Sequence, residues 1–191
     1  MKNNLQIISS LLSLQRGYVD DEYSLDLLHE AQTRVKSIAL VHEKLYRSEE
    51  LSQINMQHYV DSLTRDLLAT YNQQGVDLNL DLEEIKINIE TAIPLGLIIN
   101  ELVSNSLKYA FKVKGEGKID LSLKKYEGGY QLKVKDNGAG LPPTLDLDNP
   151  KTLGLQLVQS LVGQLDGQME VNNGEGAEFK IQFNKLIYDS R

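Results

Sequence analysis

The feature that most constrains the fold is a change in hydrophobic spacing near residue 76. Before this point, apolar side chains recur every three or four residues, which is the spacing of one helix face. From Val76 onward, most apolar side chains alternate with polar ones, as in strands that bury a single face. The chain must therefore combine a helical part with a sheet-containing part, and we predict an α+β fold.

The helical part is predicted to begin with two helices joined by a short turn. The first ends near Gly17, and the second runs from an expected N-cap at Ser24 to about Arg47. Steps of three and four residues separate the seam positions of the second helix, which are Leu28, Ala31, Val35, Ile38, His42 and Leu45. Such a heptad pattern is typical of left-handed bundle packing. Because one hairpin cannot bury both apolar faces, we predict an antiparallel hairpin that forms a four-helix bundle in a homodimer.

The rest of the chain is predicted to form a two-layer α/β sandwich. A third helix is expected from about Met56 to Gln74. Alternating runs predict strands at residues 76–82, 85–89, 119–123, 130–134 and 179–183. Helices are expected at 93–111, with Thr91 as cap and Pro94 in the first turn, and at 153–165. We expect one face of the sheet to contact solvent and the other to be covered by helices. The hairpin domain is expected at residues 1–55 and the sandwich domain at residues 56–191.

Composition excludes several classes of protein. The absence of cysteine removes disulfides, thiolate metal sites and cysteine nucleophiles. A net charge of −7 argues against general affinity for nucleic acid or for an anionic membrane surface. No run approaches the roughly 18 apolar residues of a membrane span. We therefore expect a cytoplasmic chain with no nucleic-acid partner and no direct membrane contact.

A polar stripe follows the helix predicted at residues 93–111. Glu101, Asn105 and Lys108 succeed one another at steps of four and three, beside the apolar face. An amide oxygen can complete Mg²⁺ coordination, a carboxylate can orient a nucleophile, and a lysine can neutralise phosphate charge. Taken alone, the stripe fits a solvated helix flank as well.

Asp136 falls on the inward face of the strand predicted at residues 130–134. A buried carboxylate is costly without a partner, so we expect it at a pocket rim, where it can accept a hydrogen bond from an exocyclic amine such as that of adenine. Gly138 and Gly140 allow a sharp turn and a close backbone approach to a ligand. Taken alone, the segment also reads as a plain Asp-Asn-Gly turn.

Gly154 and Leu155 lie just inside the start of the helix predicted at residues 153–165. Phosphates settle at helix N-termini, although a capped amphipathic helix explains the same pattern. The preceding residues 141–151 contain three prolines and no apolar period, which predicts a loop that can serve as a lid.

In their joint order, these residues resemble the N, G1 and G2 boxes of the GHKL superfamily of ATP-binding domains, shared by gyrase, heat-shock chaperones, MutL proteins and histidine kinases. The residues that carry the resemblance are Glu101-x-x-x-Asn105-x-x-Lys108, Asp136-x-Gly-x-Gly140 and Gly154-Leu155. Residues 2–12 and 34–46 resemble the dimerisation helices of the second histidine-kinase phosphoacceptor class, close to the HWE group.

The resemblance implies a histidine kinase core that binds ATP and Mg²⁺. It implies that Asn105 binds the metal, that Glu101 is the catalytic or water-orienting carboxylate, and that Lys108 reaches the phosphates. Tyr109 is then expected to pack against the nucleotide. The implied reaction moves the γ-phosphoryl group to a histidine of the dimerisation helix and then to an aspartate of a response regulator.

The resemblance also assigns the glycine-rich segments. Asp136 is expected to read the adenine amine, with Gly138 and Gly140 lining the base. Gly154 and Leu155 are expected to lie under the phosphates. One departure is Ala177, which stands where related kinases often carry threonine, so a hydroxyl contact to the nucleotide is not expected there.

A second departure concerns the phosphoacceptor histidine, which the resemblance places a few residues before Lys2. We expect a chain truncated just after this residue. Of the three histidines present, His42 is expected to be packed, and His29 and His58 are expected to be solvated. Two alternatives stay open, a catalytically silent nucleotide-binding dimer scaffold and a GHKL ATPase or serine-kinase relative. The predicted hairpin argues against the latter.

Overall fold

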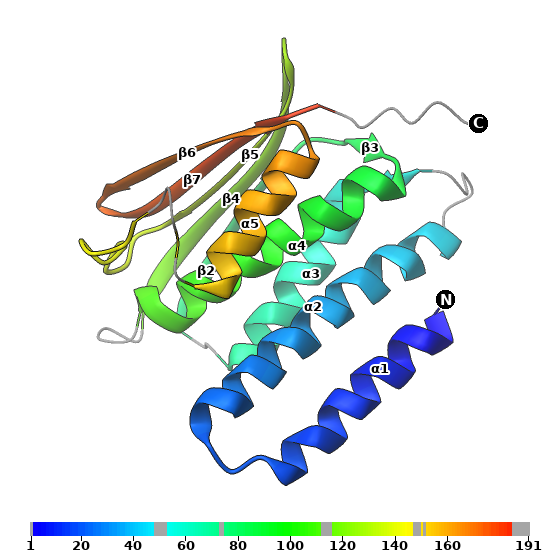
Figure 1. The fold of residues 1–191 in the computed structure, drawn as a ribbon. Coiled ribbons are helices and arrows are strands. Elements are labelled where there is room, and N and C mark those ends of the chain that lie inside the picture. The colour runs from blue at the N-terminus through cyan, green and yellow to red at the C-terminus, as the bar shows by residue number, and fades with distance from the viewer. Residues whose placement is uncertain are drawn as a thin grey trace.

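The computed structural model describes residues 2–47, 53–72, 75–111, 116–146, 150 and 152–184. Helix α1 (Lys2–Gln15), the short 3₁₀ turn η1 (Arg16–Tyr18) and helix α2 (Glu22–Arg47) form a hairpin along one side of the molecule (Figure 1). The predicted hairpin is therefore confirmed. Thr33, Ser37, Val41 and His42 of α2 are buried, while the side chain of the seam residue Leu45 lies outside the described residues.

The second part of the chain is built on a five-stranded sheet. Its strands are β2 (Val76–Leu82), β4 (Gly117–Tyr126), β5 (Gly129–Asp136), β6 (Gln168–Gly174) and β7 (Gly176–Phe183). The order across the sheet is β2-β4-β5-β7-β6, and only the β2–β4 pair is parallel. One face is apolar, and the other carries cross-strand ion pairs such as Lys133–Glu178 at 2.9 Å.

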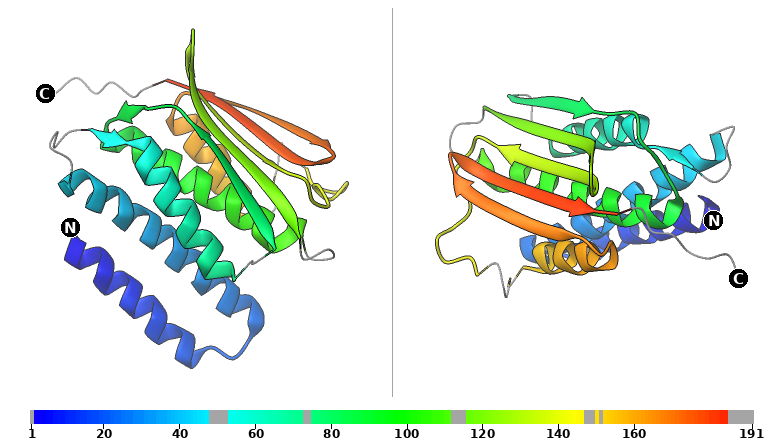
Figure 2. Two further views of the ribbon diagram at one scale, coloured as in Figure 1. Left: turned by 180° about the vertical axis from the view of Figure 1, so that it is seen from behind. Right: turned by 90° about the horizontal axis from the view of Figure 1, so that it is seen from above.

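Three helices cover the apolar face of the sheet: α3 (Met56–Tyr71), α4 (Ile89–Asn105) and α5 (Leu153–Gln164). Helix α2 packs on α4 from the side away from the sheet, as the views from the front and from behind both show (Figures 1 and 2). Every residue of α4 from Ile98 to Ser104 is buried, as expected for a helix covered on all sides. None of the described helices is long and apolar enough to cross a membrane.

The predicted two-layer sandwich with one polar sheet face is confirmed, but several boundaries were wrong. Helix α4 begins at Ile89 instead of residue 93, because the side chain of Asn88 caps it by accepting the backbone N–H of Thr91 at 3.3 Å. Pro94 consequently lies inside the helix and not in its first turn. After Asn105 the helix continues as a π-helical turn, η2 (Ser106–Ala110).

The start of α2 and the end of α3 also differ from the prediction. The backbone N–H of Ser24 donates to the side chain of Asp21 at 2.8 Å, so Asp21 and not Ser24 takes the capping role, and the helix begins at Glu22. Helix α3 ends at Tyr71, where Asn72 adopts a left-handed conformation with φ of 49°. Residues 73 and 74, in the last predicted turn, lie outside the described residues.

The strand predictions need two corrections. The run at residues 85–89 contributes only β3 (Lys86–Ile87), which pairs with β1 (Ile54–Asn55) in a separate two-stranded sheet. The edge strand β6 was missed, because it places only Met169 and Val171 toward the core within an otherwise polar run.

Helices α3 and α4 approach so closely that only glycine fits at position 96. A Cβ built there would lie 2.7 Å from Cζ of Tyr59, a fully buried ring. We expect Gly96→Ala to lower the free energy of unfolding by about 1–3 kcal/mol, because overpacking forces the ring or the helix to move. Urea-induced unfolding measures this loss.

Gly163, near the end of α5, is the matched control. A Cβ there meets no atom within 4 Å. Gly163→Ala should leave stability unchanged or raise it by roughly 0.5–1 kcal/mol, because alanine favours a helix over glycine. Equal effects of the two substitutions would contradict the close approach of α3 and α4.

Candidate functional site

The polar stripe, which runs from α4 into η2, is buried against α2 at Glu101 and Lys108. Only 5% of the surface of Glu101 and 11% of the Lys108 side chain are exposed. The solvated-flank interpretation is therefore wrong for these two residues. Charges that are buried in this way need partners, and α2 supplies them.

Arg34 of α2 binds Glu101 through two hydrogen bonds. Arg34 Nε lies 2.7 Å from Glu101 Oε1, and Arg34 Nη2 lies 2.8 Å from Glu101 Oε2. This two-bond geometry is the strong form of a guanidinium–carboxylate pair. The hydrogen bond to Glu101 raises the pKa of Arg34 above its ordinary value, although burial opposes the shift.

Glu30, one turn before Arg34, joins the pair to Lys108. Lys108 Nζ lies 2.7 Å from Glu30 Oε1, and Arg34 Nη2 lies 3.3 Å from Glu30 Oε2. Burial alone would lower the pKa of Lys108, but the hydrogen bond to Glu30 keeps it above its ordinary value. Lys108, Glu30, Arg34 and Glu101 thus form a continuous sequence of alternating charges, which we call the charge chain.

Two aromatic side chains flank the charge chain. The Lys108 ammonium lies 6.0 Å from the centre of the Tyr71 ring, and His29 meets the same ring edge-on at 5.3 Å between centroids. His29 is half-buried, so the expectation that it is solvated was wrong. The other two expectations are confirmed, because His42 is buried and His58 is exposed.

The first turn of α5 rests on the polar stripe of α4. A Cβ built at Gly154 would lie 2.7 Å from Glu101 Oε2 and 3.9 Å from Asn105 Nδ2. Glycine is therefore the residue that lets this helix N-terminus approach both side chains. The side chain of Thr152 makes no capping hydrogen bond, which leaves the first N–H groups of α5 without that partner. The side chain of Leu155 is buried in the core, so only its backbone can face a ligand.

Asp136 lies at the end of β5, and only 4% of its surface is exposed. It accepts hydrogen bonds from the Ser106 hydroxyl at 2.9 Å and from the backbone N–H groups of Gly138 at 3.0 Å and Ala177 at 3.2 Å. A carboxylate offers about four acceptor positions, so the three bonds from the described residues leave one position for a further donor. These three bonds offset the cost of burying the charge.

The loop after Asp136 packs against η2, which carries Tyr109 on an exposed position. The backbone N–H of Ala139 donates to the carbonyl of Ala110 at 3.0 Å, and a Cβ at Gly138 would overlap that carbonyl. Gly140 has φ of +73°, a left-handed conformation that favours glycine. The loop is thereby fixed beside the C-terminal end of α4.

The structure brings the predicted residues together in two neighbouring groups. Glu101 and Asn105 lie against Gly154 at the start of α5, Lys108 is joined to Glu101 through Glu30 and Arg34, and Asp136 bonds Gly138 and Ser106 beside η2. Sequence reasoning missed Glu30, Arg34, Tyr71 and Ser106. The spacing of Glu30 and Arg34, an acid four residues before a base, was the available signal for a helix-surface ion pair.

The donor set fits a metal ion that is shared with a phosphate ligand. The described residues contain no group of three or more histidine, aspartate or glutamate side chains that would hold a metal alone. Mg²⁺ is commonly bound by one or two protein oxygens together with substrate phosphates. The amide of Asn105, close to the N-terminus of α5, supplies such an oxygen.

Two family profiles match successive parts of the chain. Residues 1–71 match the profile described as histidine kinase, and residues 90–187 match that of the histidine kinase-, DNA gyrase B- and HSP90-like ATPases. The sensor histidine kinase PdtaS of Mycolicibacterium smegmatis is 32% identical over 91% of this chain, and PdtaS of Mycobacterium tuberculosis is 32% identical over 88%. The chain spans about a third of the length of these relatives, 35% and 34% respectively.

Solved structures show the same fold. The histidine kinase domain of the Erythrobacter litoralis EL346 blue-light activated histidine kinase has a TM-score of 0.76 at 18% identity, over 96% of this chain and 94% of that one. The Acinetobacter baumannii histidine kinase AdeS has a TM-score of 0.60 at 20% identity and covers 96% of both chains.

The packing of His29 predicts a specific dependence of stability on pH. Burial holds the pKa of His29 below its ordinary value of 6.5, with help from the cations Arg16, Lys108 and Lys36 and opposition from Asp26. The unfolded chain therefore takes up a proton at a higher pH than the folded chain does. The contribution of His29 to stability is complete above pH 6.5 and decreases as the pH falls below that value.

His29→Phe tests this prediction, because it keeps an aromatic edge against Tyr71 and removes the titration. The difference in unfolding free energy between the native chain and the variant should shrink as the pH falls from about 7.5 to about 5.5. A difference that stays constant over this range would show that His29 titrates alike in both states.

Proposed function

The chain belongs to the histidine kinases, and on this premise we propose that it is the ATP-dependent kinase core of a two-component signalling system. One observation carries the proposal. The N-terminus of α5 lies against Glu101 and Asn105, while Asp136 keeps one acceptor position beside η2. A nucleotide-binding site needs a phosphate site and a base site. Here both candidates lie at the C-terminal end of α4.

We propose that the phosphates bind at the first turn of α5. The N–H groups of a helix N-terminus attract anions, and Gly154 leaves room for them. Lys108, three residues after Asn105, is proposed to supply a further positive charge. With Asn105 as its protein ligand, bound Mg²⁺ would neutralise charge on the phosphate oxygens.

We propose that the base is adenine, held by Asp136. The carboxylate is already oriented by Ser106 and two backbone N–H groups, so the remaining acceptor position is fixed in direction. The amine of adenine can donate to it, whereas guanine presents a carbonyl oxygen at that edge. The site should therefore favour ATP over GTP, because the second pairing leaves two acceptors facing each other.

In the proposed reaction, an imidazole nitrogen of the acceptor histidine attacks the γ-phosphorus. The bond from this phosphorus to the β–γ bridging oxygen breaks, ADP leaves, and the imidazole loses its proton. We propose that Glu101 orients the nucleophile or accepts that proton once Arg34 releases its carboxylate. The catalytic demand is mainly one of position and charge, which is typical of phosphoryl transfer. We propose a histidine preceding Lys2 as acceptor and an aspartate of a response regulator as the next carrier.

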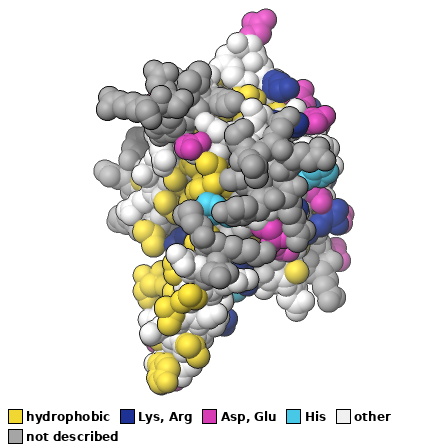
Figure 3. Space-filling model, turned by 90° about the vertical axis from the view of Figure 1, so that its right-hand side faces the viewer, with side chains coloured by type: hydrophobic (Ala, Val, Ile, Leu, Met, Phe, Trp, Pro, Cys, Tyr) yellow, Lys and Arg dark blue, Asp and Glu magenta, His cyan; other side chains and the backbone are white. Residues whose placement is uncertain are grey.

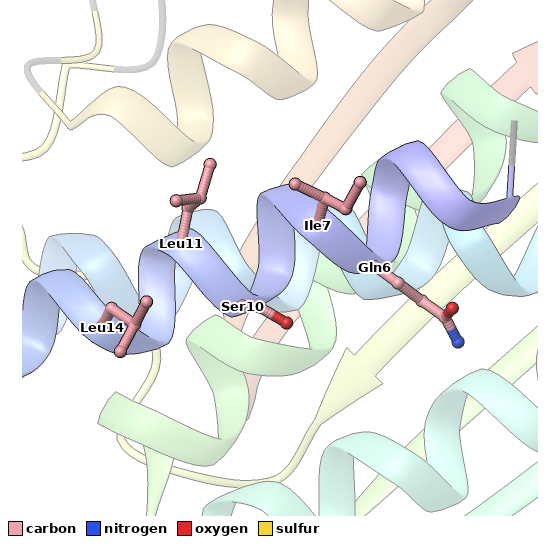
Figure 4. A pocket seen from close by; sticks show the side chains of 5 residues that line it. All are labelled: Gln6, Ile7, Ser10, Leu11 and Leu14. Carbon is pink, nitrogen blue, oxygen red and sulfur yellow. The ribbon is translucent and has the colours of Figure 1, made fainter.

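The hairpin is proposed to form a homodimer through α1. Ile7, Leu11 and Leu14 are 58%, 54% and 66% exposed, although they lie on a well-formed helix. Hydrophobic side chains gather at the lower left of the molecule in Figure 3, where α1 lies, and Figure 4 shows these three with Gln6 and Ser10 around a shallow hollow. A second hairpin would cover this face, as in a four-helix bundle. We retain residues 1–55 as the dimerising part and 56–191 as the ATP-binding part of this proposal.

Asp136→Asn and Asn105→Ala test the nucleotide site. The first should weaken ATP binding by roughly tenfold or more and reduce the preference over GTP, because an amide cannot accept all four bonds. The second should remove the part of the affinity that depends on Mg²⁺. Isothermal titration with Mg²⁺ and with EDTA measures both effects.

Asn79→Ala is the control, because Asn79 is exposed on the edge strand β2, where its side-chain amide donates to Asp120 at 2.8 Å. It should bind ATP like the native chain. Unchanged affinity in Asp136→Asn, or unchanged Mg²⁺ dependence in Asn105→Ala, would refute the corresponding assignment.

Labelling with γ-labelled ATP separates the kinase from the silent scaffold. We expect acid-labile label only on a chain extended at its N-terminus by a segment that supplies a histidine at the start of α1. Tight ATP binding with no label on either form would favour the nucleotide-binding scaffold.

A further inference from the structure

Side chains of helix α2 bind two side chains that the proposed nucleotide site needs. Arg34 binds both oxygens of Glu101, and Glu30 binds the ammonium of Lys108. Glu30 and Arg34 belong to the dimerising hairpin, whereas Glu101 and Lys108 belong to the ATP-binding part. The charge chain therefore crosses from one part of the protein to the other.

Each of the four charged side chains in the charge chain has an oppositely charged partner within the protein. Lys108 cannot give its full charge to a phosphate while Glu30 holds it at 2.7 Å. Glu101 cannot accept a proton freely while a guanidinium holds both of its oxygens. A ligand that draws Lys108 away must separate it from α2.

Uncharged contacts hold α2 against α4 and against α3 as well. Asn100 Nδ2 donates to the carbonyl of Thr33 at 3.3 Å, and the Tyr59 hydroxyl donates to the carbonyl of Ser37 at 3.3 Å. These contacts do not depend on the charge chain. The protein should therefore stay folded when one charge of the charge chain is removed.

We propose that Glu30 and Arg34 form a charge latch that competes with Mg²⁺-ATP for Lys108 and Glu101. The proposal rests on the proposed function, because it takes the ligand of these two residues to be the nucleotide. Nucleotide binding and the release of α2 from α4 are then coupled. By reciprocity, loosening the latch strengthens nucleotide binding, and nucleotide binding loosens the latch.

Glu30→Gln tests the competition for Lys108. It keeps the shape of the side chain and removes the charge that holds the ammonium. We expect ATP in the presence of Mg²⁺ to bind about five- to tenfold more tightly, as measured by isothermal titration. Asp26→Asn is the matched control, because it removes an exposed negative charge one turn earlier on the same helix.

The control separates the latch from general electrostatics. If Asp26→Asn tightens binding as much as Glu30→Gln does, repulsion of the phosphates explains the gain and the latch is refuted. Unchanged or weaker binding in Glu30→Gln also refutes it.

Arg34→Gln tests the docking of α2 without any nucleotide. We expect amide hydrogen exchange in the middle of α2, around Thr33 and Ser37, to become roughly tenfold faster, because a larger fraction of molecules release the helix. Lys36→Gln, at an exposed position of the same helix, should leave the exchange unchanged. Equal exchange in the native chain and in Arg34→Gln would refute the latch.

The two measurements distinguish the possible failures. In the native chain, Mg²⁺-ATP should speed exchange at the same amides of α2. Faster exchange in Arg34→Gln with no ATP binding by any protein would refute the proposed function and the competition together. ATP binding by all proteins with no change of exchange would refute the latch and leave the proposed function standing.

Discussion

The burial of helix α4 from both sides is the constraint on which the rest of the structure depends. The sheet covers one side of α4 and helix α2 covers the other, so even polar positions such as Asn100, Glu101 and Ser104 are removed from water. A helix that is apolar around most of its circumference needs this arrangement. The same arrangement joins the hairpin to the sandwich, because the outer cover of α4 is a helix of the hairpin.

This constraint decides how the candidate site is built. Charges placed on α4 must find partners among the elements that cover it, since an unpaired buried charge is strongly unfavourable. Glu101 and Lys108 find theirs on α2, whereas Asp136 finds Ser106 and two backbone N–H groups. The ion pairs of Glu101 and Lys108 join two parts of the chain, and they break when those parts separate. The hydrogen bonds of Asp136 lie within one part and fix its carboxylate in place. A nucleotide site needs both kinds of group, some that are rigid and some that respond to the ligand.

Much of the fold followed from hydrophobic spacing, but the boundaries and the partners did not. The period of three to four residues identified both hairpin helices, and the period of two identified the inner strands. It missed β6, whose polar side chains suit a sheet edge, and it started α4 too late because Asn88 resembles any loop residue. Motif order located Glu101, Asn105 and Asp136. No pattern within the chain could pair Arg34 with a residue 67 positions away, because that contact depends on how α2 packs on α4.

The central claim is that one end of α4 forms a nucleotide site that α2 partly occupies. A crystal structure of this chain with Mg²⁺ and a non-hydrolysable ATP analogue tests it most directly. We predict the adenine amine on Asp136, the phosphates at Gly154 with the metal on Asn105, and Lys108 released from Glu30. A nucleotide bound elsewhere would contradict the site. A nucleotide bound at this site with Glu30, Arg34, Lys108 and Glu101 still paired would contradict the competition.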